Sequence, residues 1–325
     1  MRYLVTGGAG FIGSHLTDAL IRRGDEVVIL DDFSTGSREN IVHFVGENGV
    51  NVVEGSILDS DLVDELVRSV DVCMHLASAV GVQLVVAQPL ATLQCNIRGN
   101  DIVISATARH ERRLLFTSTS EVYGKQSPGA LSEDCDSILG SPLKSRWSYA
   151  IAKSYGEALV SSHHRERDFR GTVVRLFNTV GPRQTGRYGM VVPRLVRQAL
   201  AGEDLTVYGD GQQSRCFTHV ADSVAGILDV CDSENSDGRV FNIGNPVEIT
   251  IAELARRVID RTGSRSRIVF VPYDVAYGDG FEELGRRKPD IAAIGELSGW
   301  TPQRSADEAI DQVIEFQRTM TTITA

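Results

Sequence analysis

The sequence predicts an α/β fold, in which a doubly wound parallel sheet is followed by a smaller C-terminal α/β lobe. Short apolar runs alternate with helical stretches through about residue 177, which is typical of parallel strands joined by crossover helices. A turn with three evenly spaced glycines joins the first strand to the first helix. From about residue 190, short helices are separated by short strands, which favours a lobe at the carboxyl edge of the sheet, with room for some segments to rejoin it.

The individual elements follow from the spacing of apolar residues. Short apolar runs predict buried strands, at residues 2–5, 26–30, 51–54, 72–76, 113–117, 172–177 and 240–243. Longer stretches with helical apolar spacing predict helices, at residues 11–21, 58–70, 90–109, 147–165, 191–200, 220–230, 251–261 and 306–317. We therefore expect a sheet domain over residues 1–180 and a lobe mainly over residues 181–325.

The glycine turn predicts a binding site for a pyrophosphate. Gly7, Gly10 and Gly13 lie between the first strand and the first helix. Glycines there let the backbone approach a phosphate closely, and the helix points its free N–H groups and positive dipole end at it. The third glycine also removes a side chain where helix and strand must touch. Tight turns collect glycine for other reasons too, so the motif needs support from its surroundings.

That support comes from the end of the second strand. The run over residues 26–30 ends in Asp31 and Asp32, eighteen residues past Gly13. A dinucleotide site places a carboxylate there to bind the adenosine ribose hydroxyls. The same charge repels a 2′-phosphate, which favours NAD over NADP. The competing interpretation is an exposed acidic strand end.

Composition narrows the possible partners and compartment. The net charge of −10 argues against a nucleic acid or an anionic membrane as the main partner. No stretch approaches 18 uninterrupted apolar residues, and the first strand begins too early for a signal peptide. Five widely spaced cysteines, with no Cys-x-x-Cys pair, indicate reduced thiols in a cytoplasmic protein. His163 and His164 lack spaced partner ligands, so no metal is expected.

Two loops carry residues suited to proton transfer. Tyr149 and Lys153 are four apart in a predicted helix and share one face. A lysine ammonium within a few ångströms lowers the pKa of a phenol, and a nicotinamide's positive charge would lower it further. A hydroxyl from Thr119 or Ser120, after the strand at 113–117, would share the moving proton. Alone, Tyr-x-x-x-Lys is more often an exposed helix pair; the nucleotide turn upstream favours catalysis.

Several motifs in the same order extend this pattern along nearly the whole chain. They are Thr6–Gly13, Asp31, His75–Ala77, Tyr149 with Lys153, Arg175–Arg183, Tyr208–Gly211, Arg286–Asp290 and Gly299-Trp300. With them the sequence resembles the extended short-chain dehydrogenase/reductases, whose sheet domain is a Rossmann fold, and specifically the NAD-dependent nucleotide-sugar epimerase/dehydratase family. One departure is Ser56, where that family commonly has aspartate in the adenine pocket.

The resemblance implies a role for many residues. For NAD, it implies Gly7, Gly10, Phe11, Ile12, Gly13, Asp31, Asp32, Ser34, Gly36, Ser56, Ile57, Leu76, Ala77, Ala79, Asn96, Tyr149 and Lys153. For a UDP-sugar, it implies Val80, Thr119, Glu121, Tyr149, Asn178, Arg183, Arg187, Val191, Val192, Tyr208, Arg215 and Arg287. Within this set Tyr208 is expected near the uracil and Arg287 on the pyrophosphate. A homodimer through the helices at 90–109 and 147–165 is also implied.

The resemblance also implies a shared first step with three possible outcomes. Tyr149 takes the proton of the sugar 4-hydroxyl while C4 gives a hydride to NAD⁺. The ketone then leads to 4-epimerisation, to 4,6-dehydration, or, where C6 is a carboxylate, to loss of CO₂ from a β-keto acid. Dehydration needs a protonated acid for the leaving hydroxyl, and Ser120 stands where dehydratases have aspartate.

Three runs favour decarboxylation. Thr119-Ser120-Glu121, Lys144-Ser-Arg146-Trp147 and Arg215–Thr218 resemble UDP-glucuronate decarboxylases, in which Thr119, Ser120, Glu121, Tyr149, Lys153 and Arg215 would be catalytic. Glu121 is expected to orient the proton donor to C5, or to disfavour the substrate carboxylate by like charge; alternatively it only orients the sugar. The expected products are a UDP-4-keto-pentose, UDP-xylose or both. The alternative is a 4-epimerase acting on UDP-glucuronate or UDP-glucose. A non-enzymatic NAD sensor would be expected to lack Tyr149 or Lys153, and a structural scaffold would not need the arginines at 183, 215 and 287.

Overall fold

The computed structural model describes residues 1–81, 87–126, 129–186, 189–277 and 286–324. Its centre is a seven-stranded sheet with the order β11-β6-β5-β4-β1-β2-β3, and all neighbouring strands run parallel. The strands of this sheet are Arg2–Thr6 (β1), Glu26–Asp31 (β2), Val50–Glu54 (β3), Val72–His75 (β4), Arg113–Thr119 (β5), Gly171–Leu176 (β6) and Val240–Ile243 (β11). The predicted doubly wound α/β fold is confirmed.

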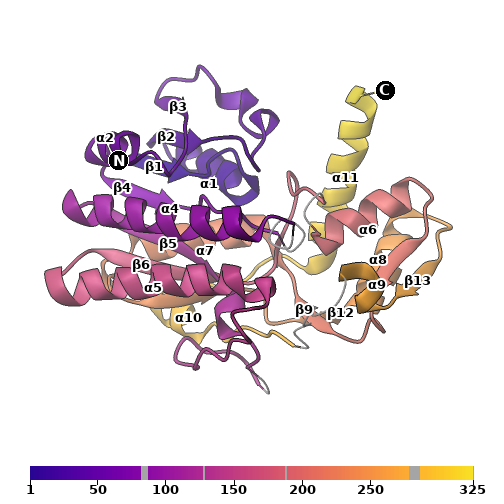
Figure 1. Cartoon of the computed structure of the whole chain (residues 1–325). Helices are drawn as coiled ribbons and strands as arrows, with labels where there is room; N and C mark the ends of the chain where they lie inside the picture. The colour runs from indigo at the N-terminus through magenta and orange to yellow at the C-terminus, as the bar shows by residue number, and fades with distance from the viewer. Residues whose placement is uncertain (82–86, 127–128, 187–188, 278–285, 325) are drawn as a thin grey trace.

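Helices cover both faces of the sheet (Figure 1). Side chains alternate between the two faces: Val5 of β1 joins the core under one helix layer, and Leu4 joins the core under the other. The first layer holds Phe11–Arg22 (α1), Val220–Asp232 (α7) and Ala292–Ser298 (α10). The second layer holds Ser60–Arg68 (α2), Pro89–Arg109 (α4) and Ser148–Arg167 (α5). This two-sided burial explains why the strands are almost uninterrupted apolar runs.

The second half of the chain builds a lobe beside the sheet, from which the C-terminal helix α11 extends (Figure 1). A third apolar core joins its helices Val191–Leu200 (α6), Ile251–Thr262 (α8) and Ala306–Thr324 (α11).

The remaining elements of the described chain are short: Thr179–Val180 (β7), Leu205–Tyr208 (β8), Ser214–Cys216 (β9), Thr218–His219 (β10), Glu248–Thr250 (β12), Ile268–Val271 (β13), Tyr273–Tyr277 (α9), and the 3₁₀ turns Arg38–Asn40 (η1), Val42–Phe44 (η2), Ser120–Tyr123 (η3), Ser145–Trp147 (η4) and Glu234–Ser236 (η5). β11 and α7 belong to this half by sequence but pack with the sheet domain.

Most predicted elements lie within a few residues of their observed bounds, and the differences have local causes. The helix predicted at 58–70 is shorter because the Asp59 side chain accepts the N–H of Leu62 at 3.1 Å and caps its first turn. The strand predicted at 113–117 continues to Thr119, so that its end reaches the hydroxyl-rich loop. The helix predicted at 306–317 continues to Thr324. Within the described residues, no helix is both long and apolar enough to cross a membrane.

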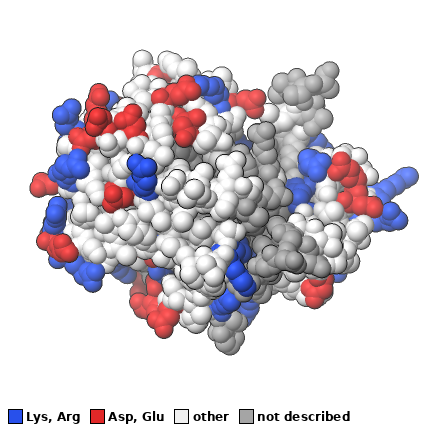
Figure 2. Space-filling view, viewed as in Figure 1, with Lys and Arg blue, Asp and Glu red and all other residues white. Residues whose placement is uncertain are grey.

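Surface charge is mixed on the face shown in Figure 2. Over the sheet domain, acidic and basic side chains alternate in small groups instead of forming one basic patch. A phosphate backbone is bound by clustered Lys and Arg. The charged side chains visible over the sheet domain in Figure 2 do not form such a cluster.

His75, at the end of β4, provides a stability prediction. The ring is fully buried, with Nδ1 at 2.7 Å from Thr6 Oγ1 and Nε2 at 3.1 Å from Asn100 Oδ1. Burial, helped by the charge of Lys153, lowers the pKa of His75 to about 3. Below about pH 6.5, His75 therefore binds a proton in the unfolded chain but not in the folded chain. The folded state consequently loses stability as the pH falls from 6.5 toward 3.

We expect His75→Gln to be less stable than wild type at pH 7.5, and the difference to narrow by about 2 kcal/mol at pH 5. The free energy of unfolding in urea at both pH values measures this. A difference between the two proteins that stays constant with pH would show that His75 does not carry the acid sensitivity.

Candidate functional site

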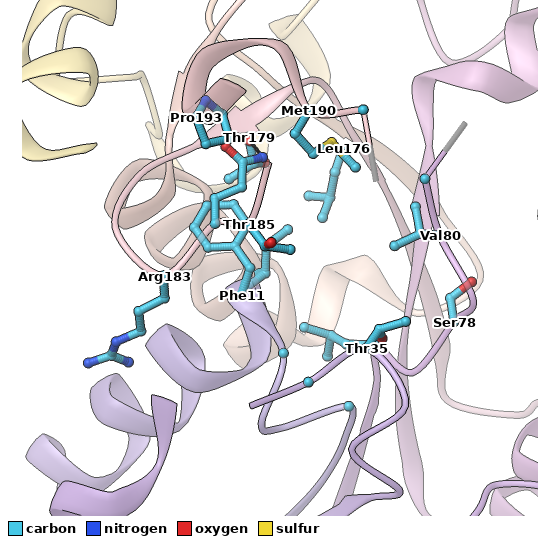
Figure 3. Close-up of a pocket in the computed structure, with 18 of the residues that line it drawn as sticks. Phe11, Thr35, Ser78, Val80, Leu176, Thr179, Arg183, Thr185, Met190 and Pro193 are labelled. Atoms are coloured by element: carbon cyan, nitrogen blue, oxygen red, sulfur yellow. Dashed lines mark hydrogen bonds between the residues drawn. The ribbon is translucent and has the colours of Figure 1, made fainter. Parts of the chain in front are cut away.

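A cavity of about 1180 Å³ lies where the carboxyl ends of the sheet strands meet the lobe. Its wall includes Gly7 after β1, Leu76 after β4 and Thr117 at the end of β5, together with Tyr208 and Phe217 from the lobe. Figure 3 shows side chains from both parts pointing toward the space between them. Ligands of doubly wound sheets bind at this edge.

The glycine turn forms one wall with its backbone alone. Gly7 has a φ of +72°, and a Cβ there would lie 2.8 Å from the backbone nitrogen of Ala77. A Cβ on Gly13 would lie 2.1 Å from the carbonyl oxygen of Gly7. Helix α1 starts directly after Gly10, which supplies no side-chain cap, so the N–H groups of the first turn remain available to a phosphate. Any residue larger than glycine would close this cradle.

Asp31 forms the next part of the wall, at the end of β2. Its carboxylate accepts the backbone N–H groups of Ala9 and Phe33, each at 2.9 Å. Burial raises its pKa, and the two N–H donors oppose that shift. Each carboxylate oxygen has two acceptor positions, so the group can still accept ribose hydroxyls from the cavity. Asp32 holds the next turn by accepting the N–H and hydroxyl of Ser34.

We expect Asp31→Ser to weaken NAD binding by about 10- to 100-fold, because a charged acceptor is lost. NADP binding should weaken less or improve, because the repulsion of its 2′-phosphate is removed as well. Fluorescence titration with each dinucleotide measures both dissociation constants. Glu39→Gln, on the same wall, is the matched control and should leave the ratio of the two constants unchanged. An unchanged ratio in Asp31→Ser would contradict the assignment.

The residues that the sequence predicts for proton transfer converge at the ends of β5 and α5. Lys153 is buried and donates from Nζ to the carbonyl of Thr117 at 2.8 Å. Burial lowers the pKa of Lys153 to about 7. The Thr119 hydroxyl accepts the N–H of Glu121 at 3.2 Å and thereby starts the 3₁₀ turn that carries Ser120 and Glu121 into the cavity wall.

The pKa of Tyr149 differs from the sequence-based expectation. Lys153 was expected to lower it; instead burial, followed by the negative charge of Glu121, raises it above its usual value, and only a hydrogen bond with Ser78 opposes this. The expectation is wrong for the chain alone because it counted the lysine and not the burial. The protein by itself keeps the phenol protonated.

Glu121 lies inside a cluster of arginines. Its Oε1 is 3.1 Å from Nη1 of Arg287, and its Oε2 is 3.4 Å from Nη1 of Arg146. Burial alone would raise the pKa of Glu121, but the charges of Arg146, Arg287 and Arg215 outweigh it and lower the pKa. All three arginines are buried. Three arginines thus surround one carboxylate, an arrangement that suits a ligand-borne anion.

Arg287 lies beside Ser120 and Glu121. Its guanidinium contacts Glu121 and lies 3.5 Å from the Ser120 hydroxyl. Its Nε is buried without a hydrogen-bond partner among the described residues. The expected contact of Arg287 with the pyrophosphate stays a prediction.

The cavity brings together most of the residues that the sequence singled out. They are Gly7, Gly10, Phe11, Ile12, Gly13, Asp31, Asp32, Ser34, Gly36, Ile57, Leu76, Ala77, Ala79, Val80, Thr119, Ser120, Glu121, Tyr149, Lys153, Asn178, Arg183, Val191, Val192, Tyr208, Arg215 and Arg287. Arg187 lies outside the described residues. Arg183 lines the cavity but pairs with Asp18 at 2.8 Å and points away from the other labelled side chains in Figure 3.

Two of the residues expected at the cofactor lie outside the cavity wall. Asn96 does not line the cavity; its amide holds the loop after β4 by accepting the N–H of Ala79 at 2.7 Å and donating to the carbonyl of Ala79 at 2.9 Å. Ser56 also lies off the cavity wall, and its hydroxyl accepts the N–H of Leu58. Both residues shape the wall without forming it.

Other residues of the wall were not assigned from the sequence. Arg146 stands in the Lys-x-Arg-Trp run, so its motif was visible although its role was not. Ser78, which contacts Tyr149, and Tyr273 of the lobe carried no signal of their own. Within the described residues, no group of three or more His, Cys, Asp or Glu side chains is arranged to hold a metal ion.

Comparison with known proteins agrees with this geometry. Residues 3–244 match the NAD dependent epimerase/dehydratase family. The chain belongs to this family. The NAD dependence of the family fits the glycine cradle, the open first turn of α1 and the carboxylate of Asp31.

Two curated proteins that are similar to this chain are named as decarboxylases. The chain is 40% identical over 318 residues, 98% of either protein, to a UDP-N-acetyl-alpha-D-glucosaminuronate decarboxylase of Bacillus cytotoxicus. It is 36% identical over 315 residues to UDP-glucuronic acid decarboxylase 1 of Danio rerio, covering 97% of this chain and 72% of the relative. Among solved structures, UDP-glucuronic acid 4-epimerase from Bacillus cereus, in complex with UDP-glucuronic acid and NAD, has a TM-score of 0.88 at 28% identity, over 98% of this chain and all of that one.

Proposed function

We propose that this member of the NAD dependent epimerase/dehydratase family decarboxylates a UDP-hexuronate, with UDP-glucuronate as the favoured substrate. The observation that carries the proposal is the buried set of Arg146, Arg215 and Arg287 around Glu121, in which three cations surround one carboxylate. These cations would attract a sugar carboxylate, whereas a neutral hydroxymethyl group would gain nothing from them. The names of the two curated relatives support the same activity.

In this proposal, Tyr149 accepts the proton of the sugar 4-hydroxyl, and Lys153 and the Thr119 hydroxyl assist it. Bound NAD⁺ supplies the acceptor for the C4 hydride and a positive charge that favours the phenolate. The resulting ketone lies β to the carboxylate, so the electrons of the C5–C6 bond pass to the ketone as CO₂ leaves. C5 then takes up a proton from a donor that Glu121 orients. The arginines hold the carboxylate until it leaves.

A 4-epimerase is the second candidate, because the similar Bacillus cereus structure is a UDP-glucuronic acid 4-epimerase. An arginine cluster would also serve an enzyme that binds the hexuronate and keeps its carboxylate. Dehydration is less favoured, because Ser120 is a buried hydroxyl within 3.5 Å of Arg287 and hydroxyls are poor acids near neutral pH.

The test is to incubate the protein and NAD⁺ separately with UDP-glucuronate, UDP-N-acetylglucosaminuronate and UDP-glucose, and to follow released CO₂ and the NMR spectrum of the sugars. CO₂ with a UDP-4-keto-pentose or UDP-xylose supports the proposal. If only UDP-N-acetylglucosaminuronate releases CO₂, the protein is a decarboxylase with that substrate in place of UDP-glucuronate. If UDP-glucuronate gives UDP-galacturonate and no CO₂, the protein is a 4-epimerase. If UDP-glucose gives UDP-galactose, the proposal of a hexuronate substrate is wrong.

We also infer that the protein acts as a cytoplasmic homodimer that pairs through α4 and α5. These two long helices pack side by side on one face of the sheet (Figure 1), and both Leu90 and Tyr155 on them are exposed. The proposed division is a sheet domain over residues 1–180 and a substrate lobe mainly over residues 181–325. Light scattering from Leu90→Glu, which should be monomeric if this face pairs, tests the dimer.

A further inference from the structure

A partly buried ion pair lies directly behind the catalytic lysine. Glu157 follows Lys153 by one turn of α5, and its side chain is 13% exposed. Its carboxylate accepts Nη2 of Arg175 at 2.7 Å and Nε at 3.0 Å. It also accepts the hydroxyl of Ser118 at 2.5 Å. Neither Glu157 nor Arg175 lines the cavity, so the pair is not placed to bind substrate.

The pair joins three elements at the place where Lys153 is held. Ser118 and Arg175 are opposite each other in the β5–β6 register, and Glu157 bridges both of them from α5. Ser118 directly follows Thr117, whose carbonyl accepts the Lys153 ammonium. A movement of α5 against the strand ends would therefore break the Glu157 contacts and the Lys153 contact together.

We propose that Glu157 is a positioning residue of the reaction centre, which keeps Lys153 cationic and bound to the Thr117 carbonyl by tying α5 to the ends of β5 and β6. For its kinetic consequence alone, this inference rests on the proposed function.

The charges around Lys153 support this role. From α5, the Glu157 charge raises the pKa of Lys153 against the larger lowering effect of burial, and Tyr149 is protonated in the chain alone. From β4, His75 is neutral near pH 7, with a pKa of about 3. From β5, the ring of Phe116 lies 4.8 Å from Nζ. From β6, Arg175 is the cation that Glu157 also pairs with. Glu157 is thus the carboxylate whose loss would leave two buried cations together.

The experiment measures the ionisation of Lys153 without substrate. The lysines of the chain are Lys125, Lys144, Lys153 and Lys288, so protein labelled with ¹³C at the lysine ε-carbon gives few signals, and Lys153→Arg identifies the one needed. Glu157→Gln should lower the pKa of Lys153 by about one unit or more. Arg175→Met should raise it, because the carboxylate loses its competing cation. Opposite shifts support the proposal.

A purely structural role predicts another pattern. If the pair only holds the fold together, both variants admit water and move the pKa of Lys153 in the same direction, or leave it unchanged; either result overturns the proposal. Should Glu157→Gln not fold, the double variant Glu157→Gln/Arg175→Met is compared with Arg175→Met, and its Lys153 pKa must be the lower of the two.

The kinetic arm uses the first hydride transfer. In the pH–rate profile of this step, the decrease in rate at alkaline pH should begin about one pH unit lower in Glu157→Gln than in wild type. Glu157→Asp should restore part of this shift. An unchanged limb counts against the proposal. If wild type turns over no UDP-hexuronate, the proposed function fails while the NMR titration still decides the role of Glu157.

Discussion

Replacement of Tyr149 with phenylalanine is expected to slow the turnover of UDP-glucuronate by about 10²- to 10⁴-fold, the usual contribution of a positioned acid–base group. Tyr149 lines the cavity at the carboxyl ends of the strands. Burial and the charge of Glu121 raise the pKa of its phenol, and a hydrogen bond with Ser78 lowers it. Phenylalanine keeps the ring and removes only the proton acceptor. NADH absorbance after rapid mixing with NAD⁺ and substrate measures the hydride-transfer step.

Tyr155→Phe is the matched control for this experiment. Tyr155 is on the same helix, its hydroxyl contacts Asp101 at 3.2 Å, and it does not line the cavity. Its loss should leave the rate nearly unchanged. A Tyr149→Phe protein that still forms NADH at the wild-type rate would assign the proton transfer to another group.

The fold and the nucleotide half of the site were predictable because their signals are local. The glycine turn, the carboxylate after the second strand and the Tyr149–Lys153 pair each lie within a short stretch of sequence. Parallel strands bring their carboxyl ends to one edge, so the order of elements alone places these groups together. Even Arg146 was visible in a motif, although its partner was not.

The part of the cavity around Glu121 was less predictable because it depends on contacts between distant segments. Arg287 contacts Glu121 although the two residues are far apart in the sequence, and no spacing rule indicates that contact. Arg183 has the expected motif, yet Asp18 of α1 holds its guanidinium elsewhere. The pKa of Tyr149 depends on its burial and on neighbouring charges. The sequence shows the helix partner at position 153, but the burial of Tyr149 cannot be inferred from it. The same holds for Glu157, whose partners come from two other elements.

Glu121 is where these distant contacts have the largest consequence for the reaction. In the proposed mechanism the three arginines would stabilise the substrate carboxylate, and that stabilisation would be lost when the carboxylate leaves as CO₂. By themselves they would therefore retain the substrate more than help it react. The fixed charge of Glu121 offsets part of their pull. It also raises the pKa of Tyr149, so its presence costs something in the oxidation step and helps in the step that follows.

Glu121→Gln is therefore expected to separate the two steps. NADH formation should persist, with its acid limb moved to lower pH because the charge that raises the pKa of Tyr149 is gone. Decarboxylation should slow by about 10²- to 10³-fold, as for loss of a preorganised charged group, and KM for UDP-glucuronate should fall together with kcat, since uncompensated arginines bind the ground state more tightly. Single-turnover absorbance and CO₂ release measure the two steps. Glu133→Gln, a partly buried carboxylate that does not line the cavity, is the control. If Glu121→Gln released CO₂ at the wild-type rate, Glu121 would only orient the sugar, and the balance between its charge and the three arginines would not control the loss of CO₂.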